Sequence, residues 1–265
     1  MKGKAALTIF LLCLIAGMHP AVSGEETQEV QDQIEKAKIF QDAYPLISET
    51  DLYCSFFILE EIPQIKIVSS ERGEEKTMLS DSDIFYVDKG RIHGLETGQV
   101  FLIVEIGPKI NIPGEKKSYG YLARKHGRAS LIGLNDMKGT ARVDKACGAV
   151  MIGNYLIPFI EKEGLLGKDL GYEVLPKENA LTGRIVYLAD DQGMIASGHW
   201  AIINLGRKHG IEVGRQMTIF KRIKEDLPRE AVGNLIVIDV GWETSTVKIL
   251  SCKEAIVLGH EVQVK

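Results

Sequence analysis

Along most of this chain, apolar residues come in short runs that glycines or charged residues separate. Residues 84–87, 100–104, 201–203 and 217–220 are runs of this kind, and they are rich in Ile, Val and Phe. Such residues favour β-strands. Glycine accounts for 27 of the 265 residues, which predicts many tight turns between these strands.

Two segments of the chain are copies of each other. Residues 83–99 align without a gap with residues 199–215, at an offset of 116 positions. Chance rarely matches so many positions, glycines included, so we infer an internal duplication. The identical pairs are Gly90 and Gly206, Gly94 and Gly210, Gly98 and Gly214, Arg91 and Arg207, His93 and His209, and Glu96 and Glu212.

The glycines of each copy predict a turn that joins two strands. Glycine at every fourth position supplies a positive φ, or lets two backbones approach closely, where the chain reverses. Leu95 and Ile211 lie between these glycines, and we expect them to be buried beneath the turns. His93 and His209 are either paired ligands or polar residues of the turn, and the second interpretation is favoured.

Both copies continue with similar elements after this turn. Five or six short strands in each copy are typical of a small closed barrel. The predicted fold class is therefore all-β, with two tandem, duplicated small antiparallel β-barrel modules and one short N-terminal helix. The matched segments are Gly120 with Gly233, residues 140–143 with 244–247, and residues 152–156 with 258–262.

The first residues predict a secretory signal. Lys2 and Lys4 precede an apolar run at 5–18, which is shorter than the roughly 20 residues of a membrane span. A retained anchor is the alternative. We expect cleavage before Glu25 and an exported chain without a transmembrane span, in the periplasm or at the periplasmic face of the outer membrane. The predicted segments are a signal peptide (1–24), an amphipathic helix (25–50), a first barrel (51–160), a linker (161–180) and a second barrel (181–265).

Charge and motifs argue against several functions. The 32 basic residues are outnumbered by 36 acidic ones, so the excess of positive charge that suits nucleic acid is absent. The sequence has no Walker, Gly-x-Gly-x-x-Gly, His-Glu-x-x-His or Gly-x-Ser-x-Gly pattern. The acidic pairs at 81 and 83 and at 190–191 lack the spaced oxygen ligands that calcium requires. We therefore expect no catalytic residue, cofactor or metal, and no enzyme.

Three cysteines remain when Cys13 leaves with the signal. An odd number in an oxidising compartment permits at most one internal disulfide. Cys54 and Cys147 belong to the same predicted barrel and are the only pair we expect to be able to form it. Three buried thiols without a disulfide are the other interpretation, and the sequence leaves both open. We expect Cys252 to be an unpaired, buried thiol.

Aromatic residues are the candidate ligand contacts. Trp242 follows a glycine and adjoins a glutamate, so we expect it either exposed at the end of a sheet or half-buried as a lid. An exposed Trp suits contact with a glycan or a protein. Tyr119 and Tyr121 are further candidates, whereas Trp200 belongs to a predicted strand and is expected to pack in the core.

The second copy resembles a known family. Residues 206–214, 217–222, 227–233 and 245–259 resemble the C-terminal β-barrel region of bacterial envelope proteins that carry an N-terminal LysM peptidoglycan-binding domain. The first copy is similar to the preceding part of those proteins, and the glycine turn is similar to the C-terminal domain of the flagellar assembly protein T. The LysM domain itself is absent from this sequence, so its glycan binding is not implied. The resemblance implies an envelope protein built from accessory barrels.

Two functional hypotheses follow. The first is a non-catalytic envelope protein that acts as a scaffold or protein-interaction module and binds another envelope protein. The alternative is an accessory protein that binds peptidoglycan or another polysaccharide through Trp242, Tyr119 or Tyr121. Binding to purified sacculi distinguishes the two.

Overall fold

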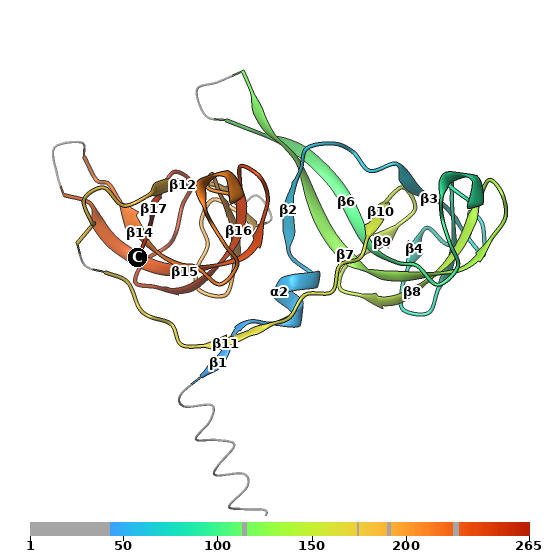
Figure 1. The fold of residues 1–265 in the computed structure, drawn as a ribbon, viewed down its shortest axis with the longest axis horizontal. Helices are drawn as coiled ribbons and strands as arrows, with labels where there is room; N and C mark the ends of the chain where they lie inside the picture. Colours follow the sequence, from blue (N-terminus) through green and yellow to red (C-terminus); the bar gives the residue numbers. More distant parts are fainter. Residues whose placement is uncertain (1–42, 113–115, 174, 190–191, 225–227) are drawn as a thin grey trace, which may run out of the picture. The chain divides into compact units, whose positions relative to one another are not determined.

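A computed structural model describes residues 43–112, 116–173, 175–189, 192–224 and 228–265. These residues form two closed six-stranded antiparallel β-barrels and one short α-helix (Figure 1). The prediction of an all-β protein with two tandem barrels is confirmed.

The first barrel lies within residues 65–158. β2 (Phe56–Leu59) extends its sheet by pairing with the first half of β7, and the short strands β4 (Met78–Leu79) and β9 (Val150–Met151) pair with each other. The strands follow the order β3 (Ile65–Ser70), β5 (Ile84–Val87), β8 (Gly139–Ala146), β7 (Ser118–Leu134), β6 (Val100–Asn111) and β10 (Tyr155–Pro158), which pairs again with β3.

The second barrel repeats this topology. Each of its strands occupies the place of the corresponding strand of the first barrel, so the duplication extends over the whole barrel. The strands follow the order β12 (Thr182–Leu188), β13 (Trp200–Ile203), β16 (Ser245–Cys252), β15 (Glu230–Val240), β14 (Gln216–Lys221) and β17 (Glu261–Val264), which pairs again with β12.

The β6–β7 hairpin of the first barrel is longer than its counterpart. Val100 and Gln216 are equivalent and lie 116 positions apart, whereas their partners Ser130 and Ile236 lie 106 positions apart. The first hairpin therefore contains ten more residues than the β14–β15 hairpin. These extra residues carry the part of β7 that pairs with β2.

This insertion changes two of the predicted equivalences. Gly127, and not Gly120, corresponds to Gly233, because each pairs with the equivalent residue of the preceding strand. Residues 140–143 likewise correspond to 246–249 rather than to 244–247. The sequence match is wrong here because an insertion inside a hairpin alters the register without altering the pattern of short strands.

The glycine turns have the same structure in both barrels. A short 3₁₀ turn, η1 (Arg91–His93) or η3 (Arg207–His209), ends at a left-handed glycine, with φ of 81° at Gly94 and 74° at Gly210. Gly98 and Gly214 also have positive φ, at 90° and 85°. These four positions therefore favour glycine for its backbone freedom.

The first glycine of each turn has a different role. A Cβ at Gly90 would lie 2.5 Å from the carbonyl oxygen of Asn135, and one at Gly206 would lie 2.6 Å from that of Trp242. Close backbone packing therefore excludes any side chain at these two positions. Leu95 and Ile211 lie buried in the barrel cores next to the turns.

The two equivalent histidines belong to the turns. His93 Nδ1 accepts a hydrogen bond from the Gly90 amide at 3.1 Å, and His209 Nδ1 accepts one from the Gly206 amide at 3.0 Å. Each ring therefore caps its own 3₁₀ turn, which supports the interpretation as turn residues.

Residues before the first barrel do not continue a helix. β1 (Tyr44–Ile47) pairs with β11 (Leu165–Gly167), and α2 (Glu49–Tyr53) begins after the N-cap Ser48. The helix predicted over 25–50 thus does not cover 44–47, because Leu46 and Ile47 pack in extended conformation on β15. The predicted linker likewise contains a strand, β11.

The predicted signal peptide and helix residues 25–42 lie outside the described residues. Within the part of the chain that the structure describes, no helix has the length and apolar character needed to cross a membrane.

Candidate functional site

Residues 43–265 form one compact unit, in which α2 contacts the second barrel through a buried carboxylate. Asp51 accepts hydrogen bonds from Trp200 Nε1 at 2.8 Å and from Lys248 Nζ at 2.7 Å. The Ser48 amide also donates to it, at 2.8 Å. Burial opposes ionisation of Asp51, but these partners outweigh burial and lower the pKa of its carboxyl.

A second buried ion pair connects the two barrels. Lys125 of β7 donates a hydrogen bond to Asp239 of β15 at 2.9 Å, and Lys162 donates to the other carboxylate oxygen at 2.8 Å. The Lys125 side chain is only 3% exposed, and it also donates to the carbonyl oxygen of Leu52 at 2.7 Å. Burial opposes the charge of Asp239, but the two ammonium groups outweigh it and lower its pKa. We call Lys125, Lys162 and Asp239 the buried charge cluster.

Trp200 lies at this junction and not in a barrel core. Its neighbours Ala201 and Ile203 face inward, so Trp200 and Ile202 face outward on β13. The Trp200 ring packs edge-on against Phe56 of β2, at 6.3 Å between ring centroids. Trp200 is therefore a packing residue, as expected, but it packs between the barrels and not inside one of them, because strand alternation places it on the outer face of β13.

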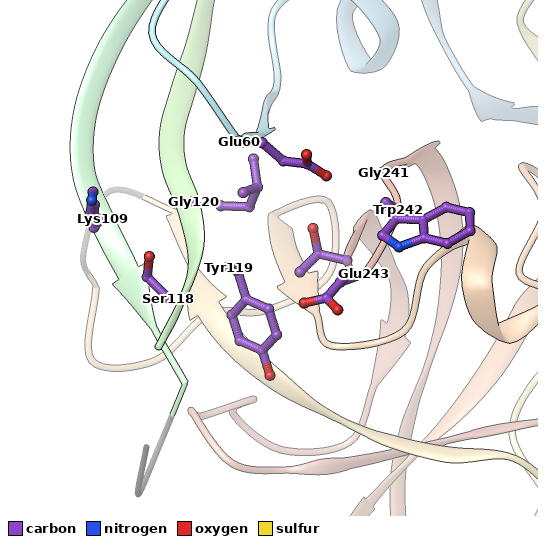
Figure 2. Close-up of a pocket in the computed structure, with 10 residues that line it drawn as sticks. Glu60, Lys109, Ser118, Tyr119, Gly120, Gly241, Trp242 and Glu243 are labelled. Atoms are coloured by element: carbon purple, nitrogen blue, oxygen red, sulfur yellow. The ribbon is translucent and has the colours of Figure 1, made fainter. Parts of the chain in front are cut away.

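A hollow of about 320 Å³ lies where the β6–β7 hairpin, the end of β2 and the loop between β15 and β16 meet. Tyr119 of β7 and Trp242 of the loop between β15 and β16 both line this hollow. Figure 2 shows the Trp242 ring directed away from Tyr119, with Glu243 between the two residues in that view. Trp242 is 57% exposed, which agrees with the exposed position expected for it rather than with a half-buried lid. Further lining residues are Glu60, Lys109 and Ser118.

Tyr121 does not line this hollow. It lies two residues beyond Tyr119 in β7, and the ammonium group of Lys109 lies 4.8 Å from the centre of its ring. The structure therefore brings two of the three candidate aromatic residues together, and Tyr121 contacts the hollow only through Lys109.

The hollow combines groups that suit a polar ring-shaped ligand. The face of Trp242 offers an apolar surface, and Glu60 and Glu243 offer hydrogen-bond acceptors for hydroxyl groups. Glu243 is also held by Lys208, which fixes its position.

Two parts of the predicted linker, residues 168–173 and 175–177, lie against the outer face of the second barrel; we call them together the strap. Side chains of the barrel hold its main chain: the Leu170 amide donates to Gln216 at 3.0 Å, and the Lys177 amide donates to Gln263 at 2.7 Å. Gln216 and Gln263 are buried although they face outward from the barrel. Polar contacts to the backbone therefore hold the strap in place.

The leucines of this region, in contrast, are exposed. Leu166, just before the strap, is 66% exposed, and Leu170 and Leu175 within it are 71% and 73% exposed. We call these three residues the leucine row. Polar contacts thus hold the strap, while the side chains of the leucine row remain largely exposed to solvent.

The structure places Cys54 and Cys147 in a disulfide, with 5.7 Å between their Cα atoms. Cys54 follows α2 directly and Cys147 follows β8, so the bond ties the helix to the first barrel. Cys252 is free, as expected, but it is partly exposed rather than buried, because it lies at the end of β16 beside Ser197.

Sequence reasoning missed the buried charge cluster and the side chains that hold the strap. Lys125 lies in a basic stretch of β7, between Arg124 and His126, so the sequence carries no signal of its burial. Asp239 follows the apolar run of β15, which does indicate a buried partner. Gln216 and Thr218 alternate with apolar residues in β14, which indicates an outward face but not what covers it.

The described residues offer no group of three or more His, Cys, Asp or Glu side chains arranged to hold a metal ion. In comparisons with known proteins, no family model matches this chain, and no curated protein matches it either. The resemblance to LysM-type envelope proteins therefore stays a prediction.

Proposed function

We propose that this protein is an exported, non-catalytic scaffold that binds another envelope protein through the leucine row. The observation that carries the proposal is the contrast between the strap and its leucines. Polar side chains of the barrel hold the strap, while Leu166, Leu170 and Leu175 stay largely exposed. Exposed apolar surface of this kind is typical of protein interaction sites.

A hollow beside this region supports the proposal that a partner protein binds here. Leu165 packs close to Gly214, so the start of this region lies beside Val213 of the second barrel. Val213 and Ile160, which are 52% and 71% exposed, line a hollow of about 700 Å³ together with Tyr53, Phe57 and Phe159. Lys125, Lys162 and Asp239 of the buried charge cluster also line this hollow, so it offers both apolar and charged groups to side chains of a partner protein.

Replacing Leu166, Leu170 and Leu175 together by serine is expected to weaken partner binding at least about tenfold, since three apolar contacts are lost. The free energy of unfolding should change by less than about 0.5 kcal/mol, because the leucine row is exposed. Quantitative pull-down from an envelope extract, with mass spectrometry of the captured proteins, measures the first effect, and urea unfolding measures the second.

A matched control changes equally exposed residues of the first barrel. Met78, Ile92 and Met137 are 57%, 65% and 57% exposed, and their joint replacement by serine should leave partner capture intact. Capture that is equal for wild type and for the leucine-row variant would contradict the proposal. So would a wild-type protein that captures no partner.

A second candidate function is saccharide binding at the hollow of Trp242, Tyr119, Glu60 and Glu243. The specific observation that favours it is an exposed Trp face beside two carboxylates in a concavity of about 320 Å³. Cavities of a few hundred Å³ are the size that small ligands occupy.

For this second function, Trp242→Ala is expected to reduce co-sedimentation with purified sacculi about tenfold, because stacking on an aromatic face contributes roughly 1 kcal/mol beyond area burial. Met137→Ala is the matched control: Met137 is also 57% exposed and lies in the equivalent loop of the first barrel. Wild-type protein that stays in the supernatant, or equal losses in both variants, would exclude this site.

A further inference from the structure

One end of the second barrel carries a third hollow, and its lining is rich in basic side chains. It has a volume of about 620 Å³ and lies where β12 and β17 begin and β14 ends (Figure 1). Arg184, Lys221 and Arg222 line it, together with His260 and Glu261. Basic side chains thus converge on one hollow of a chain whose net charge is −4.

The charges at this hollow do not cancel. Glu261 is buried and binds two arginines, Arg222 at 3.1 Å and Arg229 at 2.9 Å, while Glu254 pairs with Lys221 at 2.7 Å. The guanidinium of Arg184 has no acidic partner among the described residues. Among the lining side chains, three cations therefore face one carboxylate, which leaves an excess of two positive charges, and the charges of Arg229 and Glu254 outside the lining cancel each other.

His260 adds an unsatisfied polar group. It is 9% exposed, and its Nδ1 has no hydrogen-bond partner among the described residues. A buried polar atom without a partner is costly unless a ligand or a water molecule satisfies it. Burial also lowers the pKa of this imidazole.

The first barrel has the same topology as the second but lacks most of these basic groups, so the barrel fold does not require them. The register places Lys66, Glu105, Ile106 and Asn154 at the positions of Arg184, Lys221, Arg222 and His260. There Glu105 supplies a negative charge, and Asn154 satisfies its side chain by accepting a hydrogen bond from the Met151 amide at 2.8 Å. The basic hollow is therefore specific to the second barrel.

We propose that this hollow is an anion site that binds a phosphate group, with Arg184, Lys221 and Arg222 as its charged ligands. A phosphate monoester carries close to two negative charges at pH 7, which matches the excess of positive charge, and arginine binds phosphate oxygens in a bidentate manner. Glu261 positions the Arg222 guanidinium. The inference is independent of the leucine row and of the Trp242 hollow.

Titration of the ¹⁵N-labelled protein with inorganic phosphate tests the site by NMR. We expect saturable shifts of the amides of residues 221–222 and 257–261, absent in sodium chloride of equal ionic strength. The double variant Arg184→Gln/Arg222→Gln should weaken phosphate binding at least tenfold, whereas Lys66→Gln, at the equivalent place of the first barrel, should leave it unchanged. Glucose 6-phosphate is titrated in parallel. Whichever of the two ligands binds more tightly shows whether the site prefers a phosphorylated sugar or free phosphate.

Three outcomes would overturn the proposal. They are a response to chloride equal to that for phosphate, shifts that persist in the double variant, and shifts that spread over the surface without saturating. Folding of the double variant is checked by its unperturbed amide spectrum away from the hollow.

Discussion

Asp239→Asn is expected to lower the free energy of unfolding by about 3–5 kcal/mol, the usual cost of removing one partner of a buried ion pair. The substitution leaves Lys125, which is 3% exposed, and Lys162 without their carboxylate. A buried, uncompensated ammonium group is the main source of the loss. Urea unfolding followed by circular dichroism measures it.

Asp136→Asn is the matched control for this substitution. Asp136 pairs with Arg91 on the surface of the first barrel, where both side chains are more than half exposed, so its loss should cost less than about 1 kcal/mol. Similar losses for the two variants would contradict the role assigned to the buried charge cluster.

The dependence of stability on pH provides a second test of the role of the Asp239 carboxylate. The pKa of Asp239 is lower in the folded protein than the value of about 3.9 in the unfolded chain. Its contribution is therefore complete above the unfolded pKa and is lost as the pH falls through the folded pKa. Asp51 behaves in the same direction. Between about pH 5 and pH 2, wild type should lose more stability than Asp239→Asn, because asparagine does not titrate.

Removing the disulfide with Cys54→Ala and Cys147→Ala is expected to cost about 4 kcal/mol. The bond closes a loop with a sequence separation of 93 residues, and closure of a long loop restricts the unfolded chain strongly. Cys54 also adjoins α2, whose Asp51 contacts the second barrel, so the contact of α2 with Trp200 and Lys248 should loosen as well. Thermal unfolding with and without reductant measures the effect.

Reductant and Cys252→Ala serve as controls for the disulfide. Reduced wild type should unfold like the double alanine variant, and Cys252→Ala should respond to reductant as wild type does, since Cys252 is free. Thiol counting in denaturant without reductant, on protein from residue 25 onward, should find one free thiol. Three free thiols would exclude the bond.

Much of the fold could be predicted from the sequence because its signals are local. The glycines at 94, 98, 210 and 214 have positive φ, a conformation that favours glycine whatever surrounds it. Short apolar runs between such turns leave few architectures other than small barrels, and the duplication predicts that both halves share one. Trp242 next to a glycine likewise indicated a loop, where the structure places it exposed.

Other features depended on which surfaces meet in the folded chain. The predicted match of residues 140–143 with 244–247 was wrong, because only the strand pairing shows the insertion in the β6–β7 hairpin. Trp200 was placed in a core because a strand run does not reveal which face is inward.

By itself the sequence determined the two barrels and their glycine turns, since the backbone conformation of a turn depends on residues adjacent in the chain. Only the tertiary structure decided the partner of Lys125, the exposure of the leucine row and the basic hollow around His260. Lys125 and Asp239 are 114 positions apart in the chain. The strength of such an ion pair depends on its burial, which segments distant in the sequence create. The buried charge cluster forms where the outer faces of the two barrels meet, and the basic hollow forms at one end of the second barrel. The alternating pattern of a strand indicates which residues face outward but not what lies against them.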